Sequence, residues 1–100
     1  MVQIRWLKEA KADLKDIYDY ISSDSKRYGR LQVERIKDRT QILKSHIEIG
    51  KVVEEVNDPA IRELIEGNHR IIYRVVTMNR IDVLMVHHGA RDLTRRIKLL

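Results

Sequence analysis

The chain has 100 residues, 43% hydrophobic and 35% charged, with a net charge of +5, which predicts one globular domain and excludes a disordered chain. It contains no cysteine, which excludes a disulfide framework and thiolate chemistry and fits a reducing cytoplasm. No apolar run approaches the roughly 20 residues of a membrane span, and the N-terminus lacks an apolar stretch of signal-peptide length, so we expect a soluble, cytoplasmic protein.

The first half of the chain predicts a strand followed by two helices. Residues 2–6 are rich in β-branched and aromatic side chains and predict a short strand. Residues 8–22 place apolar side chains at helical spacing, and the polar tract 22–25 breaks that helix and offers an N-cap for the next. Residues 26–47 then predict a second helix. Because the break is so short, the two helices should form an antiparallel hairpin.

The second half predicts a meander of three antiparallel strands. After Gly50 the sequence becomes strand-like, and residues 61–66, 69–77 and 81–88 are apolar runs separated by turn signals. The predicted fold is therefore α+β, with an N-terminal strand, a helical hairpin and a meander packed on the helices. We expect a single domain over residues 1–100, in which residues 92–100 form a basic C-terminal tail.

Alternation along residues 69–77 separates an apolar face from a face with two arginines. His69, Ile71, Tyr73 and Val75 can face the helices, while Arg70 and Arg74 lie on the other, open face with Ile72 and Val76. The two guanidinium groups could hold one extended anion. The alternative, which spacing alone favours somewhat, is a cross-strand ion pair with Glu63 or Glu66, worth roughly 0.2–1 kcal/mol. Residues 81–88 are apolar on both faces, so periodicity does not assign their sides.

Positive charge concentrates toward the C-terminus. Residues 61–100 carry a net charge of +4, and seven of their eight cations are arginine, whereas residues 1–60 carry +1. Arginine binds carboxylate and phosphate well, so the positive charge of this segment predicts an anionic partner. A solvated surface with no partner is an alternative of equal weight. The tail holds Arg91, Arg95, Arg96 and Lys98. Arg91 and Arg95 would share a face if the tail is helical, and otherwise the tail is a frayed terminus.

The histidines do not predict a metal site. His87 and His88 are adjacent on a strand, so they point to opposite faces, and no helical H-x-x-x-H spacing occurs. One histidine near Arg70 and Arg91 could be a general acid or base in phosphodiester cleavage, although a hydrogen-bonded structural role is more common. We interpret the other two histidines, the tryptophan and the four tyrosines as structural, with Tyr28 fitting least well. No P-loop, G-x-S-x-G motif or dinucleotide fingerprint occurs.

Three segments together resemble the ParE/RelE superfamily, the small toxins of bacterial type II toxin–antitoxin systems, which serve in plasmid stabilisation. They are EAKADLKDIYDYI, IRELIEGNHRIIYRV and VLMVHHGARDL, and the resemblance extends over residues 4–93. It implies an antiparallel sheet with an N-terminal helical hairpin, no cofactor and no metal. It also implies a cognate antitoxin with a partly disordered C-terminal segment, expected to bind residues 61–100 and an apolar groove beside the helical hairpin.

The superfamily includes two activities on one fold, so fold alone does not decide between them. RelE-type members cut mRNA on the ribosome without a metal, and here that reading would use Arg70, His88 and Arg91. ParE-type members poison DNA gyrase. RelE-type members usually carry a tyrosine or another acid/base near the C-terminus, and this chain has no tyrosine after Tyr73. It also has Glu54 and Glu55 in the region where RelE-type members have a basic loop. The resemblance therefore favours a ParE-like toxin, with target-binding or anion-binding residues Arg70, Arg74, Arg91, Arg95 and Arg96. A member that keeps antitoxin binding without toxicity is a third reading.

Overall fold

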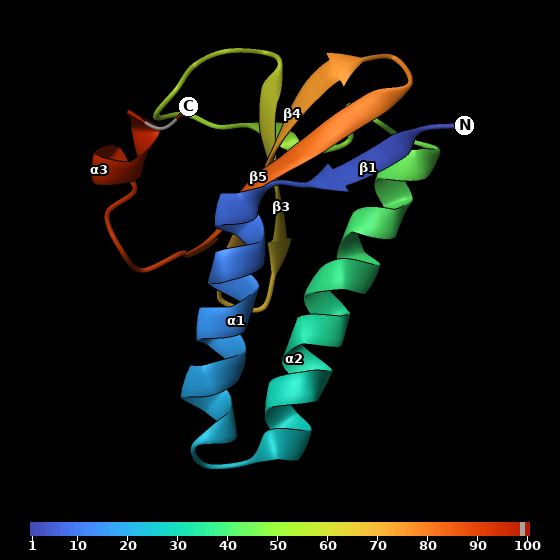
Figure 1. Ribbon diagram of the computed structural model, residues 1–100. Coiled ribbons are helices and arrows are strands. Elements are labelled where there is room, and N and C mark those ends of the chain that lie inside the picture. Colours follow the sequence, from blue (N-terminus) through green and yellow to red (C-terminus); the bar gives the residue numbers. More distant parts are fainter. Residues whose placement is uncertain (99) are drawn as a thin grey trace.

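The computed structural model describes residues 1–98 and 100, and its five strands form one sheet in the order β1-β5-β4-β3-β2 (Figure 1). The elements in chain order are β1 (Gln3–Trp6), α1 (Lys8–Ser22), α2 (Lys26–Arg39), the 3-10 helix η1 (Thr40–Lys44), β2 (Lys51–Val52), β3 (Ile61–Glu66), β4 (His69–Thr77), β5 (Arg80–His88) and α3 (Thr94–Ile97). The predicted α+β class, the helical hairpin and the antiparallel meander are confirmed. None of the helices in the described part of the chain has the length and apolar character needed to cross a bilayer.

The second helix is shorter than predicted. Ser25, in the predicted capping tract, accepts a hydrogen bond from the Tyr28 N–H, so α2 begins where expected. It ends at Arg39 rather than near residue 47, and the chain winds on as η1. The Thr40 hydroxyl donates to the carbonyl of Lys37 at 2.7 Å, a backbone contact that competes with regular α-helical winding. The tighter turn keeps Leu43 fully buried in the core.

The two long helices, α1 and α2, pack on one face of the sheet, and the other face is covered as well. Ile71 and Tyr73 are buried, and Val75 is partly buried, in the cluster formed with α1, α2 and η1, as alternation predicts. On the other face, residues from three strands and Val53 form a second cluster with Leu93, against which Ile97 and Leu100 pack. The prediction of an open face is therefore wrong. The tail is not a frayed terminus either, since it covers this face.

The structure of β5 explains why alternation along the sequence did not predict which face of the sheet each of its side chains lies on. The register against β4 shifts so that Ile72 faces Met85 while Tyr73 faces Val83, which leaves Leu84 as an extra residue. At such a bulge two successive side chains point the same way, and Leu84 and Met85 both join the second cluster. In addition, β1 pairs with β5 in parallel, so β5 lies between two strands and is apolar on both faces.

Candidate functional site

Arg70 is held by two carboxylates on the second face of the sheet. Its guanidinium donates to both oxygens of Glu55, at 2.7 and 2.9 Å, and its Nε donates to Glu63 at 2.7 Å. The side chain is only 14% exposed. The hydrogen bond from Arg70 lowers the pKa of Glu55 to about 2, and the same bond raises the pKa of Arg70. The alternative of an ion pair with Glu63 is confirmed. Glu55, from the loop after β2, is a second partner that spacing did not indicate.

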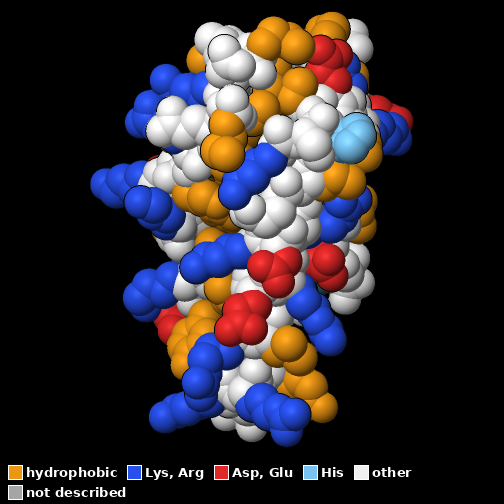
Figure 2. Space-filling model, turned by 90° about the vertical axis from the view of Figure 1, so that its right-hand side faces the viewer, with side chains coloured by type: hydrophobic (Ala, Val, Ile, Leu, Met, Phe, Trp, Pro, Cys, Tyr) orange, Lys and Arg blue, Asp and Glu red, His pale blue; other side chains and the backbone are white. Residues whose placement is uncertain are grey.

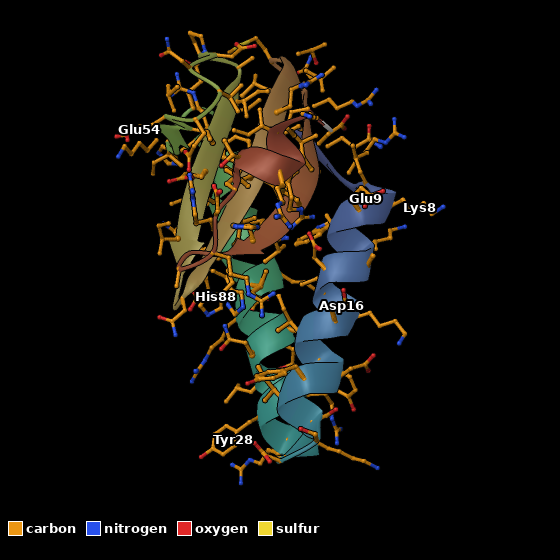
Figure 3. The ribbon with its side chains drawn as sticks, turned by 90° about the vertical axis from the view of Figure 1, so that its left-hand side faces the viewer. Lys8, Glu9, Asp16, Tyr28, Glu54 and His88 are labelled. Carbon is orange, nitrogen blue, oxygen red and sulfur yellow. The ribbon has the colours of Figure 1, made fainter. Side chains whose placement is uncertain are left out.

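Two further arginines form hydrogen bonds that join the C-terminal segment to α1 and β4. Arg96 donates to Asp13 of α1 at 2.8 Å, and the same carboxylate oxygen accepts the Val86 N–H at 2.9 Å, next to the bulge. Arg74 donates to the main-chain oxygen of Leu100 at 2.8 Å. Figure 3 shows α3 over the sheet, between α1, marked by Glu9 and Asp16, and the loop with Glu54. These contacts make the tail an integral part of the fold.

Arg91 and Arg95 are exposed and, within residues 1–98 and 100, take part in no ion pair. Arg91 precedes α3, so no helix contains both residues and the two do not share a helical face. Of the five predicted target-binding arginines, these two are therefore free to meet a partner, while Arg70, Arg74 and Arg96 have partners within the chain. The binding role of all five stays a prediction.

Arg70 and His88, the two residues that a nuclease would combine, are not assembled into one site. Arg70 lies opposite His87 in the β4–β5 register and His69 opposite His88, so Arg70 and His88 point to opposite faces of the sheet. His87 is buried and its Nε2 lies 3.0 Å from the carbonyl oxygen of Arg91. The rings of His69 and His88 meet edge to face, 5.7 Å apart, and burial lowers the pKa of His69. In the described part of the chain, no group of three His, Asp or Glu side chains is placed to hold a metal.

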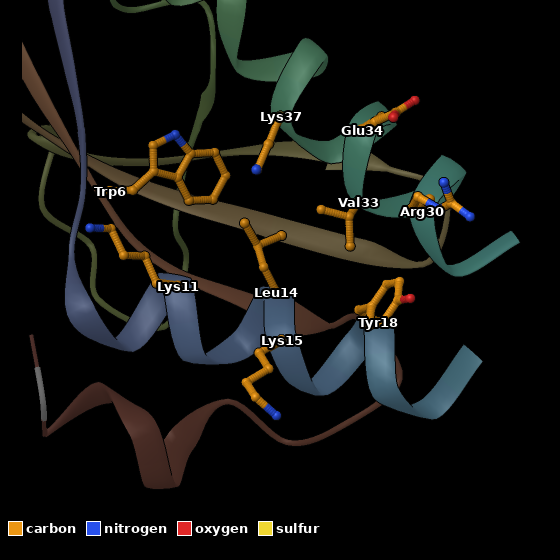
Figure 4. A pocket seen from close by; sticks show the side chains of 9 residues that line it. All are labelled: Trp6, Lys11, Leu14, Lys15, Tyr18, Arg30, Val33, Glu34 and Lys37. Atoms are coloured by element: carbon orange, nitrogen blue, oxygen red, sulfur yellow. The ribbon is translucent and has the colours of Figure 1, made fainter. Parts of the chain in front are cut away.

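A groove of about 580 Å³ runs between α1 and α2 (Figure 4). Apolar and aromatic side chains line it: Trp6, Leu14, Tyr18 and Val33. Four cations and one carboxylate complete the lining: Lys11, Lys15, Arg30, Lys37 and Glu34. An apolar groove beside the hairpin was expected, but its basic rim was not. The signal was present in the sequence, since these cations recur at helical spacing beside the apolar stripe.

Comparison with known proteins identifies the family and the fold of the chain. The model of the family described as the ParE toxin of the type II toxin–antitoxin system, parDE, matches residues 4–93. A solved structure described as the chromosomal ParDE TA system from P. aeruginosa is similar with a TM-score of 0.70. That match has 23% sequence identity and covers 88% of this chain and 96% of the other. At this identity the structural match supports the fold alone. No curated protein sequence matches.

Proposed function

The chain belongs to the ParE toxin family of type II toxin–antitoxin systems, and we propose that it inhibits DNA gyrase and is neutralised by a cognate antitoxin. The observation that carries the choice of gyrase is the placement of Arg70 and His88 on opposite faces of the sheet. A ribosome-dependent mRNA endonuclease would need both beside one phosphodiester. A missing proton-transfer group costs such a reaction about 10²–10⁴-fold in rate.

On this proposal the toxin acts by binding rather than by catalysis. It would bind gyrase more tightly in the state that holds cleaved DNA than in the other states, and so would increase the population of that state. The exposed Arg91 and Arg95 are the predicted target-binding residues that remain free for this contact. Arg70 would support the surface by fixing the loop that carries Glu55. Such a target places the toxin in the cytoplasm.

The groove between α1 and α2 is the surface we propose for the antitoxin. Its apolar lining fits the apolar side chains of an amphipathic segment, and its basic rim fits carboxylates on the same segment. A C-terminal antitoxin segment that is partly disordered when free would fold as it binds here. The solved relative is described as a ParDE system, which agrees with an antitoxin partner for this chain.

The gyrase proposal is tested with purified toxin, gyrase and supercoiled plasmid. We expect cleaved DNA to accumulate and supercoiling to fall, and we expect added antitoxin to reverse both effects. Unchanged supercoiling and cleavage would contradict the proposal. Cleavage of ribosome-bound mRNA in a purified translation system would instead support the endonuclease reading.

The groove is tested by charge reversal on its rim. We expect Lys11→Glu with Lys37→Glu to weaken binding of the antitoxin segment by more than about tenfold, because two favourable charge contacts become repulsive. Lys8→Glu with Lys44→Glu is the matched control, since it changes the net charge equally at exposed positions outside the groove. Equal loss in both variants would contradict the proposed surface.

A further inference from the structure

Helix α2 carries the largest concentration of unpaired positive charge in the described structure. It holds six cations, Lys26, Arg27, Arg30, Arg35, Lys37 and Arg39, against two carboxylates, Glu34 and Asp38. Within residues 1–98 and 100, none of the six forms an ion pair. Arg39 is half-buried, and its Nε donates to the carbonyl of Ile65, while the other five are exposed.

Four of these cations share one flank of the helix. At 100° per residue, Lys26, Arg27, Arg30 and Lys37 fall within about 100° of the helix circumference, and they extend over about 16 Å along the axis. We call these four residues the α2 flank. The hairpin projects beyond the sheet, with α2 on its outer side (Figure 1), and Lys and Arg side chains gather along it and at its free end (Figure 2). Glu34 lies on the same flank and leaves its net charge at +3.

We propose that the α2 flank binds the phosphate backbone of duplex DNA without sequence preference. A cluster of exposed, unpaired cations along one side of a helix is the electrostatic footprint of backbone recognition. This inference goes beyond the proposed function, because it requires neither gyrase nor the antitoxin.

Two features of the flank favour duplex DNA over other anionic partners. Single strands bind through bases stacked on aromatic side chains, and the only aromatic residue of α2 is Tyr28. Protein interfaces centre on a desolvated apolar patch. On the part of the flank that lies outside the groove between α1 and α2, the hollow is instead lined by Arg27, Arg30 and Glu34, with Leu31 as its one apolar side chain.

The flank and the groove are not independent surfaces. Arg30 and Lys37 belong to the α2 flank and also line the groove. A segment bound in the groove would therefore cover two of the four cations, and DNA and that segment would compete for the toxin.

Fluorescence anisotropy with a labelled random-sequence duplex of about 20 base pairs tests the proposal. We expect the logarithm of the binding constant to fall with the logarithm of salt concentration with a slope of about −3 to −4, as four phosphate contacts require. Arg27→Glu with Arg30→Glu should weaken binding by at least about 30-fold at about 0.1 M salt. Thermal unfolding would verify that this variant is folded, and Arg27→Gln with Arg30→Gln would give a smaller loss in the same direction.

Lys8→Glu with Lys98→Glu is the matched comparison, because it changes the net charge equally at two exposed residues that lie outside the α2 flank and form no ion pair in the described part of the chain. At the same salt concentration of about 0.1 M, where the Debye length is about 10 Å, we expect it to weaken DNA binding by less than about threefold, because exposed charges farther than this from the flank are screened. Equal loss in the two variants, tighter binding of a single strand than of the duplex, or no binding by the wild-type protein would each overturn the proposal. Because no gyrase is present, any of these results leaves the gyrase assay to be judged separately.

Discussion

The arginines of the sheet and the cations of α2 differ in what they contact. Of the seven arginines in residues 61–100, four are in ion pairs: Arg62 with Glu48, Arg70 with Glu55 and Glu63, Arg80 with Asp82, and Arg96 with Asp13. The six cations of α2, within the described residues, have no such partner. The C-terminal half has the higher net charge, yet the free positive charge lies mainly on the helical hairpin.

The difference shows that net charge along a sequence does not measure the charge available to a partner. A strand residue meets side chains from both neighbouring strands and from loops that cross the sheet, so a partly buried arginine there needs a carboxylate to offset its desolvation. A cation on the outer side of a projecting helix stays hydrated and needs no partner. Substitutions at partly buried and at exposed charged residues test this difference, beginning with the largest expected effect.

Arg70→Ala should be the most destabilising of these changes. It leaves Glu55 and the 11%-exposed Glu63 without their shared counter-ion, so we expect a loss of about 2–4 kcal/mol in the free energy of unfolding. Urea unfolding at pH 7 measures it, and a double-mutant cycle with Glu55→Gln gives the coupling. A loss below about 0.5 kcal/mol is typical of a surface substitution. It would show that Arg70, like the cations of α2, does not need its ionic partners for stability.

Asp13→Ala should loosen the C-terminal segment. The substitution removes the acceptor of the Val86 N–H and the partner of Arg96, which we expect to cost about 1–3 kcal/mol. Amide hydrogen exchange should accelerate in residues 93–98 more than in α2. Asp16→Ala is the control, because Asp16 is exposed on the same helix. If exchange in the tail is unchanged, Asp13 does not hold it.

Glu55 should make the stability of the protein depend on pH in a defined window. Its pKa is lowered from 4.5 to about 2 in the folded chain, so its contribution is fully present above pH 4.5 and is lost as the pH falls toward 2. Because the side chain is 33% exposed, we expect the loss to be about 1–2 kcal/mol after solvent screening. Urea midpoints between pH 6 and pH 2 should fall less steeply in Glu55→Gln. Glu54→Gln, whose exposed side chain pairs with Lys51, should keep the wild-type profile.

Arg27→Ala with Arg30→Ala should have the smallest effect on folding. Neither side chain has an ionic partner in the described structure, so we expect a change within about 0.5 kcal/mol, measured by thermal or urea unfolding. A loss approaching that of Arg70→Ala would show that these two arginines stabilise the fold. It would then contradict the distinction between the ion-paired arginines of the sheet and the unpaired cations of α2.

Local sequence determined much of the fold but not the partners of its charged residues. The ranges 61–66 and 69–77 are the observed bounds of β3 and β4, because their alternation and the turn between them are local signals. The cover of the second face was missed because it depends on Leu93 and on residues that follow β2. The contacts of Arg96 with Asp13 and of Arg70 with Glu55 join residues 83 and 15 positions apart, and no local pattern encodes them.

The most direct test of gyrase inhibition is to follow DNA and protein synthesis separately, with labelled thymidine and labelled methionine, after the toxin is induced without antitoxin. We predict that DNA synthesis falls first and that the SOS response is induced. An earlier fall in protein synthesis, with mRNA cut at codons, would contradict gyrase as the target. If neither synthesis falls, the chain is a member of the family without toxicity.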